Sequence, residues 1–256
     1  MFKRAILTPI NENVTLVNDN NDSTFYVVHG TEKALIIDTA NGYENVMEIA
    51  RSITDLPIEV VCTHGHCDHV YGNVYCNEAW MHPDDFELCK EHFAFPKVVE
   101  EMKKRHLNPC PLKALTIGQV FDLGGGLTLE VVPLFGHTAG SIGLLDRKHR
   151  ILFSGDGVIP QIWMQLPESA PIATLKTTLE ALLAQHGTEF DYVLTGHGHE
   201  LKDGIAMANG LLRGCDELLA GDTAQDPDYP YFAGVAKAHP YGPGENQKIC
   251  YTEDKL

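Results

Sequence analysis

The chain has 256 residues, of which 19 are basic and 35 are acidic, so its formal net charge at pH 7 is −16. Its hydrophobic content of 44% is enough for the core of one large domain or two small ones, which excludes disorder over most of the chain. The acidic balance disfavours a protein that follows a phosphate backbone or binds an anionic membrane surface. We therefore expect neither a nucleic acid nor a membrane as partner.

The seven cysteines form an odd set without a C-x-x-C pair, which fits reduced intracellular thiols better than a disulfide framework. The apolar stretch behind the first basic residues is too short to be the core of a signal peptide. No apolar run approaches the length of a membrane span. These features favour a cytoplasmic protein.

Short, nearly continuous apolar segments alternate with segments of wider apolar spacing, which is typical of strands buried on both faces and of helices that cover them. In chain order, we expect strands at 23–29 and 33–37, a helix at 43–53, a strand at 58–63, helices at 83–93 and 97–106, strands at 127–134 and 151–154, a helix at 172–185, a strand at 191–195 and a helix at 203–219.

Two regions differ from this framework. Residues 83–113 are amphipathic and helical and interrupt two strand-rich halves, so we expect a helical cap or lid there. Residues 222–246 are rich in Pro, Gly and Tyr, and we expect an irregular loop before a last strand at 247–251. Neither region has the length of an independent domain, so we expect residues 1–256 to form a single domain.

The decisive segment is Thr-His-Gly-His-Cys-Asp-His at residues 63–69, which follows an apolar strand. Three imidazoles (His64, His66 and His69) and the carboxylate of Asp68 lie within six residues, and a loop at a strand end can turn all four toward one point. Divalent transition metals bind this mixture of nitrogen and oxygen ligands. A merely His-rich surface tract would lack the strand before the loop. The segment therefore predicts a metal site.

Four more ligand-capable residues follow expected strands: Asp38, His137, Asp156 and His197. Taken singly, each has an ordinary structural explanation, such as a turn or a helix cap. Strand ends along one edge of a sheet are neighbours in space, however, so residues far apart in sequence can converge there. We expect these four to lie beside the histidine loop.

The pattern His64-x-His66-x-Asp68-His69, followed by His137, Asp156 and His197, resembles that of the metallo-β-lactamase superfamily, in particular its glyoxalase II-like hydrolase branch. The resemblance extends from about Asp38 to His199. It implies an α/β fold, an αβ/βα sandwich of two mixed β-sheets flanked by helices, with the metal site at one sheet edge.

The resemblance also implies a role for each residue of the pattern. A first metal ion would be bound by His64, His66 and His137, a second by Asp68, His69 and His197, and Asp156 would bridge the two. Asp38 would support the histidine loop without being catalytic.

Two divalent ions, for which zinc is our first expectation and iron or manganese the alternatives, would activate a hydroxide for attack on a small ester, thioester or lactone. Asp68 is the expected catalytic residue, orienting the hydroxide or passing a proton to the leaving group. Glutathione thioesters are disfavoured because 59 residues after His197 leave little room for the helical domain that binds glutathione in glyoxalase II enzymes. Lactones are disfavoured because Gly157 and Val158 stand where lactone-cleaving members place a tyrosine.

The same residues are also compatible with a second function. Persulfide dioxygenase-like members of the fold are iron-dependent oxidoreductases that use one iron at the positions of His64, His137 and Asp156. Metal content separates this alternative from the dinuclear hydrolase.

Several other residues lie near the pattern or could line a pocket beside it. Cys67 lies between ligand positions, and we expect a small buried side chain rather than a ligand. We expect His199 beside the site but not as a ligand. Five side chains are candidates for lining a substrate pocket: Tyr71, Phe95, Trp163, Met164 and Tyr241.

Overall fold

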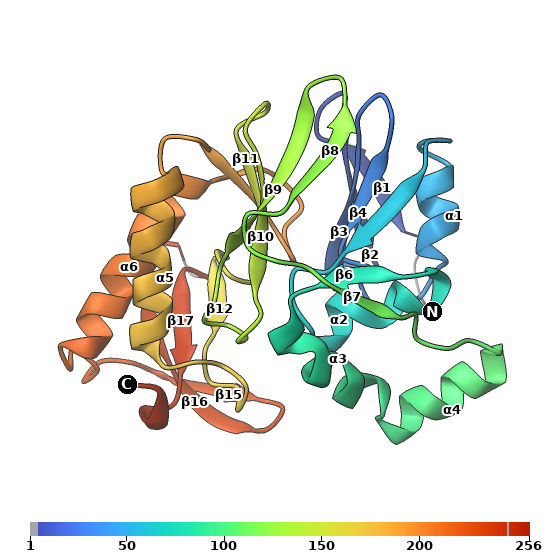
Figure 1. The fold of residues 1–256 in the computed structure, drawn as a ribbon. Coiled ribbons are helices and arrows are strands. Elements are labelled where there is room, and N and C mark those ends of the chain that lie inside the picture. Colours follow the sequence, from blue (N-terminus) through green and yellow to red (C-terminus); the bar gives the residue numbers. More distant parts are fainter. Residues whose placement is uncertain (1–4, 245) are drawn as a thin grey trace.

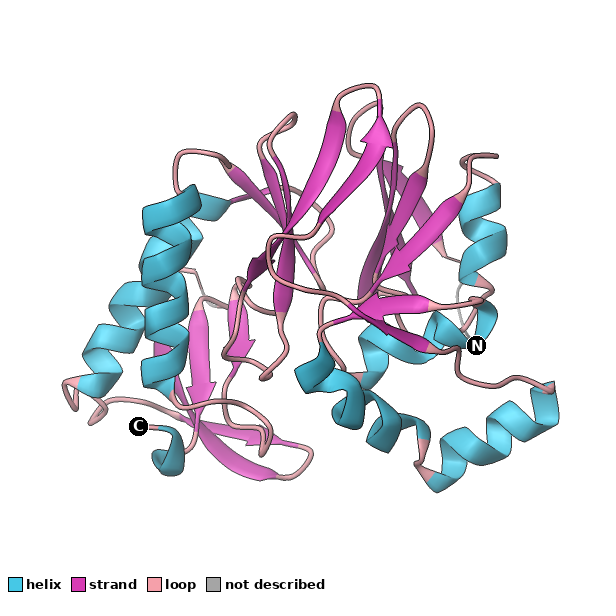
Figure 2. Cartoon of the chain, in the orientation of Figure 1, coloured by secondary structure: helices cyan, strands magenta, loops and turns pink. Residues whose placement is uncertain are grey.

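The computed structural model describes residues 5–244 and 246–256. Two large mixed sheets pack face to face, helices cover their outer sides, and a small third sheet lies beside the second one (Figures 1 and 2). The predicted α/β sandwich is therefore confirmed, and the third sheet is an addition to it. Of the described helices, none is long and apolar enough to cross a membrane.

The first sheet has seven strands in sequential order, antiparallel from β1 to β4 and parallel from β4 to β7. Its strands are β1 (Ile6–Pro9), β2 (Val14–Asp19), β3 (Ser23–His29), β4 (Ala34–Ile37), β5 (Ile58–Val61), β6 (Ala79–Met81) and β7 (Leu112–Ala114). The helical segments between them are α1 (Val46–Arg51), α2 (Cys67–Val70), η1 (Tyr71–Tyr75), η2 (Pro83–Asp85), α3 (Phe86–Phe93) and α4 (Pro96–Arg105).

The second sheet has six strands in the order β14-β13-β11-β10-β9-β8. These are β8 (Val120–Gly124), β9 (Leu127–Pro133), β10 (Ile142–Asp146), β11 (Ile151–Gly155), β13 (Tyr192–Thr195) and β14 (Lys202–Asp203). Its outer side is covered by α5 (Ile172–His186) and α6 (Gly204–Leu219), which share one hydrophobic core with it.

The core between the two sheets explains why the strands are apolar without alternation. Tyr26 of β3 points toward the second sheet, where its ring lies 5.2 Å from that of Phe153 on β11. The neighbouring residues Phe25 and Val27 point the other way, into the core beneath the helices. Both faces of β3 are thus buried, and apolar residues occupy successive positions.

The third sheet corrects the expectation of an irregular loop at 222–246. Its order is β12-β17-β16-β15, with β12 (Gln161–Trp163), β15 (Asp228–Tyr231), β16 (Gly234–Pro240) and β17 (Lys248–Tyr251). Proline and glycine made this stretch resemble a loop, but Pro230 lies on the edge strand β15, where a missing N–H is tolerated. The last strand was predicted correctly; the short segment η3 (Glu253–Lys255) follows it.

Candidate metal centre

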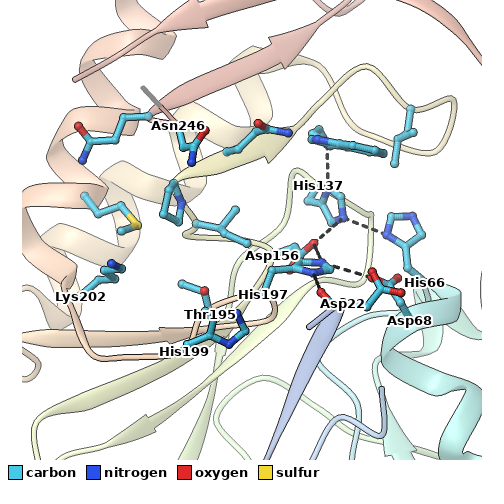
Figure 3. A pocket seen from close by; sticks show the side chains of 18 of the residues that line it. Asp22, His66, Asp68, His137, Asp156, Thr195, His197, His199, Lys202 and Asn246 are labelled. Atoms are coloured by element: carbon cyan, nitrogen blue, oxygen red, sulfur yellow. Dashed lines mark hydrogen bonds and ion pairs between the residues drawn. The ribbon is translucent and has the colours of Figure 1, made fainter. Parts of the chain in front are cut away.

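The predicted ligands come together at one edge of the sandwich. The histidine loop follows β5. The four-residue helix α2, which begins immediately after His66, carries Asp68 and His69. His137 follows β9, Asp156 follows β11 and His197 follows β13. Their side chains gather in the close-up of Figure 3, although up to 133 positions separate the first from the last in the sequence.

The first group of side chains consists of three histidines, and we call it the first cluster. Nδ1 of His66 lies 3.0 Å from Nε2 of His64 and 2.9 Å from Nε2 of His137. The three nitrogens could hold one metal ion, and all three side chains are buried.

The other ring nitrogen of each first-cluster histidine determines its tautomer. His66 Nε2 donates to the carboxylate of Glu168 at 2.7 Å, and His137 Nδ1 donates to the carbonyl oxygen of Trp163 at 2.7 Å. His64 Nδ1 lies 3.1 Å from Oγ1 of Thr63, whose own proton is directed to a carboxylate. The inner nitrogens of the three rings therefore face one another, an arrangement that a cation satisfies.

The second group, which we call the second cluster, contains Asp68, His69 and His197. Asp68 Oδ2 lies 3.2 Å from Nε2 of His197 and 3.8 Å from Nε2 of His69. His197 Nδ1 donates to the carbonyl oxygen of Asp22 at 2.7 Å, so its Nε2 faces the cluster. Figure 3 shows the His197 ring between the carboxylates of Asp68 and Asp156.

Asp156 lies between the clusters. Its Oδ2 is 3.8 Å from Nε2 of His137 and 3.3 Å from Nε2 of His197, and its Oδ1 is 3.6 Å from Nε2 of His69. Asp156 Oδ1 and His69 Nε2 are both buried without a hydrogen-bond partner. Buried polar atoms are rarely left unpaired, so this pair of atoms fits a site made for a cation.

The electrostatics differ between the clusters. Burial, reinforced by His66, lowers the pKa of His137 to about 4, and burial with its histidine neighbours holds the pKa of His64 well below its usual value. Burial acts in the same direction on His197, but Asp156 and Asp68 outweigh it and raise the pKa of that residue to about 12. In the metal-free protein the second cluster is thus held by ion pairs, and a metal ion must displace the proton on His197.

Two buried aspartates fix the loops that carry these ligands. Asp38, at φ +63°, accepts from the Thr63 N–H at 2.6 Å, from Thr63 Oγ1 at 2.8 Å and from His69 Nδ1 at 2.9 Å. Asp85 accepts from the N–H groups of Gly65 and Gly140 at 2.8 and 2.7 Å. Asp38 therefore orients the histidine loop, and Asp85 links that loop to the one carrying His137.

Close packing around the site also depends on one glycine. A Cβ on Gly196 would lie 2.4 Å from both Asp156 Oδ1 and His69 Cε1, so any larger residue would displace these groups. The strand β13 can therefore end against the second cluster only with glycine before His197.

A cavity of about 1190 Å³ opens over the clusters. Of the five side chains proposed to line it, only Trp163 does so; Met164 and Tyr241 are buried in the core instead. From residues 83–113, only His92 reaches the cavity.

Cys67 and His199 also line the cavity. Burial raises the pKa of the Cys67 thiol to about 11, and within residues 5–244 and 246–256 neither Cys67 nor His199 belongs to a group that could hold a metal ion. His199 Nδ1 lies 3.1 Å from the side-chain nitrogen of Asn18.

The residues of the site that the sequence pattern did not predict include Asp85, His92 and Glu168. Asp85 and His92 lie in the segment expected to form a cap, and Glu168 lies in the connection before α5. No strand precedes any of them directly, so the strand-end pattern that revealed the other residues could not reveal these.

Glu168 provides a test of the outer hydrogen bonds. Replacing Glu168 by Gln keeps the size of the side chain but weakens the charge-assisted bond to His66, so we expect metal affinity to fall about 10- to 100-fold. Titration with a competing chelator measures this affinity. The matched control is Glu180→Gln on the exposed side of α5, where affinity should be unchanged; equal affinity in the two variants would contradict this role.

Comparisons with known proteins find similar sequences and similar folds. The model of the metallo-beta-lactamase superfamily matches residues 18–197. The acyl-coenzyme A thioesterase MBLAC2 of Gallus gallus is 30% identical over 162 residues, covering 54% of this chain and 58% of that protein. A hydroxyacylglutathione hydrolase of Brucella ovis is 29% identical over 181 residues, covering 70% and 62% respectively.

Solved structures with the same fold include the DIM-1 metallo-beta-lactamase, with a TM-score of 0.64, 20% identity, and coverage of 85% of this chain and 100% of that one. A metallo-beta-lactamase from Pontibacter korlensis gives a TM-score of 0.62 at 19% identity, covering 83% and 99%. At these identities, the two structures bear on the fold alone.

Proposed function

The chain belongs to the metallo-beta-lactamase superfamily, and from this premise we propose that it is a metal-dependent hydrolase of small thioesters. The observation that carries the proposal is the meeting of two ligand clusters on either side of Asp156, beneath one cavity. The names of the two curated relatives, an acyl-coenzyme A thioesterase and a hydroxyacylglutathione hydrolase, support a thioester rather than an ester or lactone. The matched region spans about three fifths of each relative's length.

The first cluster would hold one divalent ion and the second cluster another, with Asp156 shared between them. Zinc is the ion we propose first, because imidazole and carboxylate ligands suit it. Bound ions would supply an activated water and a Lewis acid for the carbonyl oxygen of the substrate.

The chain's own groups then have separable tasks. Glu168, Trp163 and Asp22 hold the outer nitrogens of His66, His137 and His197, and so aim the inner nitrogens at the site.

Asp68 also lines the cavity, and a quarter of its side chain is exposed. A carboxylate in that position could accept a proton from the attacking water and pass it to the leaving thiolate.

A direct test combines metal analysis with a substrate panel. We expect purified protein to contain two divalent ions per chain and to hydrolyse acyl thioesters faster than matched esters, lactones, phosphodiesters and β-lactams. Chelation should abolish activity, and added zinc should restore it. One iron per chain with oxygen uptake on a persulfide would instead establish the oxidoreductase.

Replacing Asp68 by Asn should lower kcat by about 100-fold or more and change KM by less than about threefold, because the amide cannot accept or deliver the proton. Turnover is measured at saturating metal, and metal content is determined on the same sample so that ion loss is not mistaken for loss of proton transfer. Asp203→Asn is the control. Asp203 is the N-cap of α6, and asparagine caps a helix as well as aspartate does, so this variant should keep its kcat. Unchanged kcat in the fully loaded Asp68 variant would remove this residue from the mechanism.

A further inference from the structure

The small third sheet has two different faces. Ile162 of β12 is paired in register with Ile249 of β17, and both are fully buried in the core shared with α5 and α6. On the opposite face lies Trp163, whose register partner is Cys250. This second face borders the cavity, because Gln161 and Trp163 both line it.

Four aromatic side chains gather on the second face and the adjoining turn, and we call them the aromatic wall. They are Trp163, Tyr229, Tyr231 and Phe232. The ring centroid of Trp163 lies 6.2 Å from that of Tyr229, 6.4 Å from that of Tyr231 and 6.2 Å from that of Phe232. The rings therefore support one another at distances typical of aromatic contacts.

Small residues complete the packing of the wall. Tyr229 is paired in register with Ala236, and Ala238 with Cys250; these three small side chains are at most 5% exposed. Bulky rings beside small buried side chains give the wall a fixed position on the sheet.

Two members of the wall, Trp163 and Phe232, line the cavity, and Phe232 is 81% exposed. It lies between β15 and β16, at the tip of the hairpin. Val235 on the same hairpin is 61% exposed but does not line the cavity. An exposed aromatic ring at the mouth of a site is typical of a contact made with a ligand.

The wall begins at the metal centre. The backbone carbonyl oxygen of Trp163 accepts the hydrogen bond from His137 Nδ1, and Trp163, His66 and His137 line the same cavity. The cavity is lined by the apolar residues Ile159, Leu166 and Met207 as well as by the polar residues Lys202, His199 and Asn246, which are labelled in Figure 3. A ligand at the centre could thus contact Trp163 and Phe232 with an apolar part and Lys202 with a polar part.

We propose that the aromatic wall binds the apolar acyl group of the substrate, with its carbonyl at the metal centre and its polar leaving group toward Lys202. This inference rests on the proposed thioester hydrolysis for the direction of the bond that is cleaved. Most of the wall lies beyond residue 197, where the superfamily match ends. Substrate specificity would thus depend on residues outside the region that the family model matches.

A binding experiment tests the wall without turnover. The chain has two tryptophans, so in a Trp80→Phe background the fluorescence of metal-loaded protein reports Trp163 alone. We expect linear carboxylates from acetate to decanoate to quench it with a Kd that falls about three- to fourfold per added CH₂ until the chain reaches Phe232. Phe232→Ala should raise the Kd of decanoate at least tenfold and leave that of acetate unchanged, whereas Val235→Ala, the matched control, should change neither.

The same variants are then compared on acyl thioesters of increasing chain length. A rise of kcat/KM with chain length that is lost in Phe232→Ala supports the wall as the acyl site. A chain-length dependence that is equal in wild type and Phe232→Ala overturns it, as does a dimer in solution that Phe232→Ala dissociates, because a second copy would then cover the ring.

The two proposals can fail separately. Carboxylate binding that depends on chain length, without hydrolysis of any thioester, would retain the wall and reject the thioesterase. Hydrolysis at a rate independent of chain length, with flat carboxylate affinities, would retain the thioesterase and reject the wall.

Discussion

Replacing Asp156 by Asn is expected to lower kcat/KM by at least about 10³-fold and to reduce the metal retained by the protein. Asp156 contacts His137 of the first cluster and both His69 and His197 of the second. A neutral amide removes the charge that would offset the two proposed cations, so the affinity of both clusters for metal ions should fall. Metal content after dialysis and thioester hydrolysis at several metal concentrations measure the two effects.

The control for this variant is Asp191→Asn. Asp191 precedes β13 and forms an exposed ion pair with Arg150, so the same chemical change there should leave metal content and activity unaffected. Two tightly held ions and near-normal activity in Asp156→Asn would show that this carboxylate is not shared between the clusters. Loss of ions in the Asp191 variant as well would indicate a general loss of structure.

The sandwich and the strand ends were predictable because burial on both faces produces a pattern that is visible locally. The strand at 23–29 was predicted at its observed bounds, since successive apolar residues there serve two cores. Two strands that were not predicted are β1, which is exposed at all four positions, and β6, which has only three residues. Strands this short or this exposed carry too few apolar residues to distinguish them from loops.

Some residues of the site were likewise predictable from the sequence, and others were not. Residues placed at strand ends were found because glycine, histidine and aspartate follow apolar runs. Glu168 and Asp85 act through hydrogen bonds to loops 102 and 20 residues away, and a lone carboxylate in a connection has no sequence feature that reveals its partner. The aromatic wall was not predicted because Pro230 and Gly234 made its hairpin resemble a loop. In the structure, Pro230 lies on an edge strand and Gly234 follows the turn, and both positions tolerate these residues.

Replacing Asp38 by Ala should destabilise the metal-free protein by about 3 to 5 kcal/mol. The carboxylate is buried, and removing it leaves the Thr63 N–H and His69 Nδ1 without acceptors. Alanine is also a poorer residue than aspartate at a φ of +63°. Urea unfolding in the presence of a chelator measures the free energy without any contribution from bound metal.

Asn at the same position separates the two causes of this loss. Asp38→Asn tolerates the positive φ and keeps one acceptor oxygen, so its loss of stability should lie between those of wild type and Asp38→Ala. A metal-free Asp38→Ala variant within about 1 kcal/mol of wild type would mean that Asp38 matters only when metal is bound. The expected loss without metal instead means that the histidine loop is held in place by the fold, so that its ligands are oriented before any ion arrives.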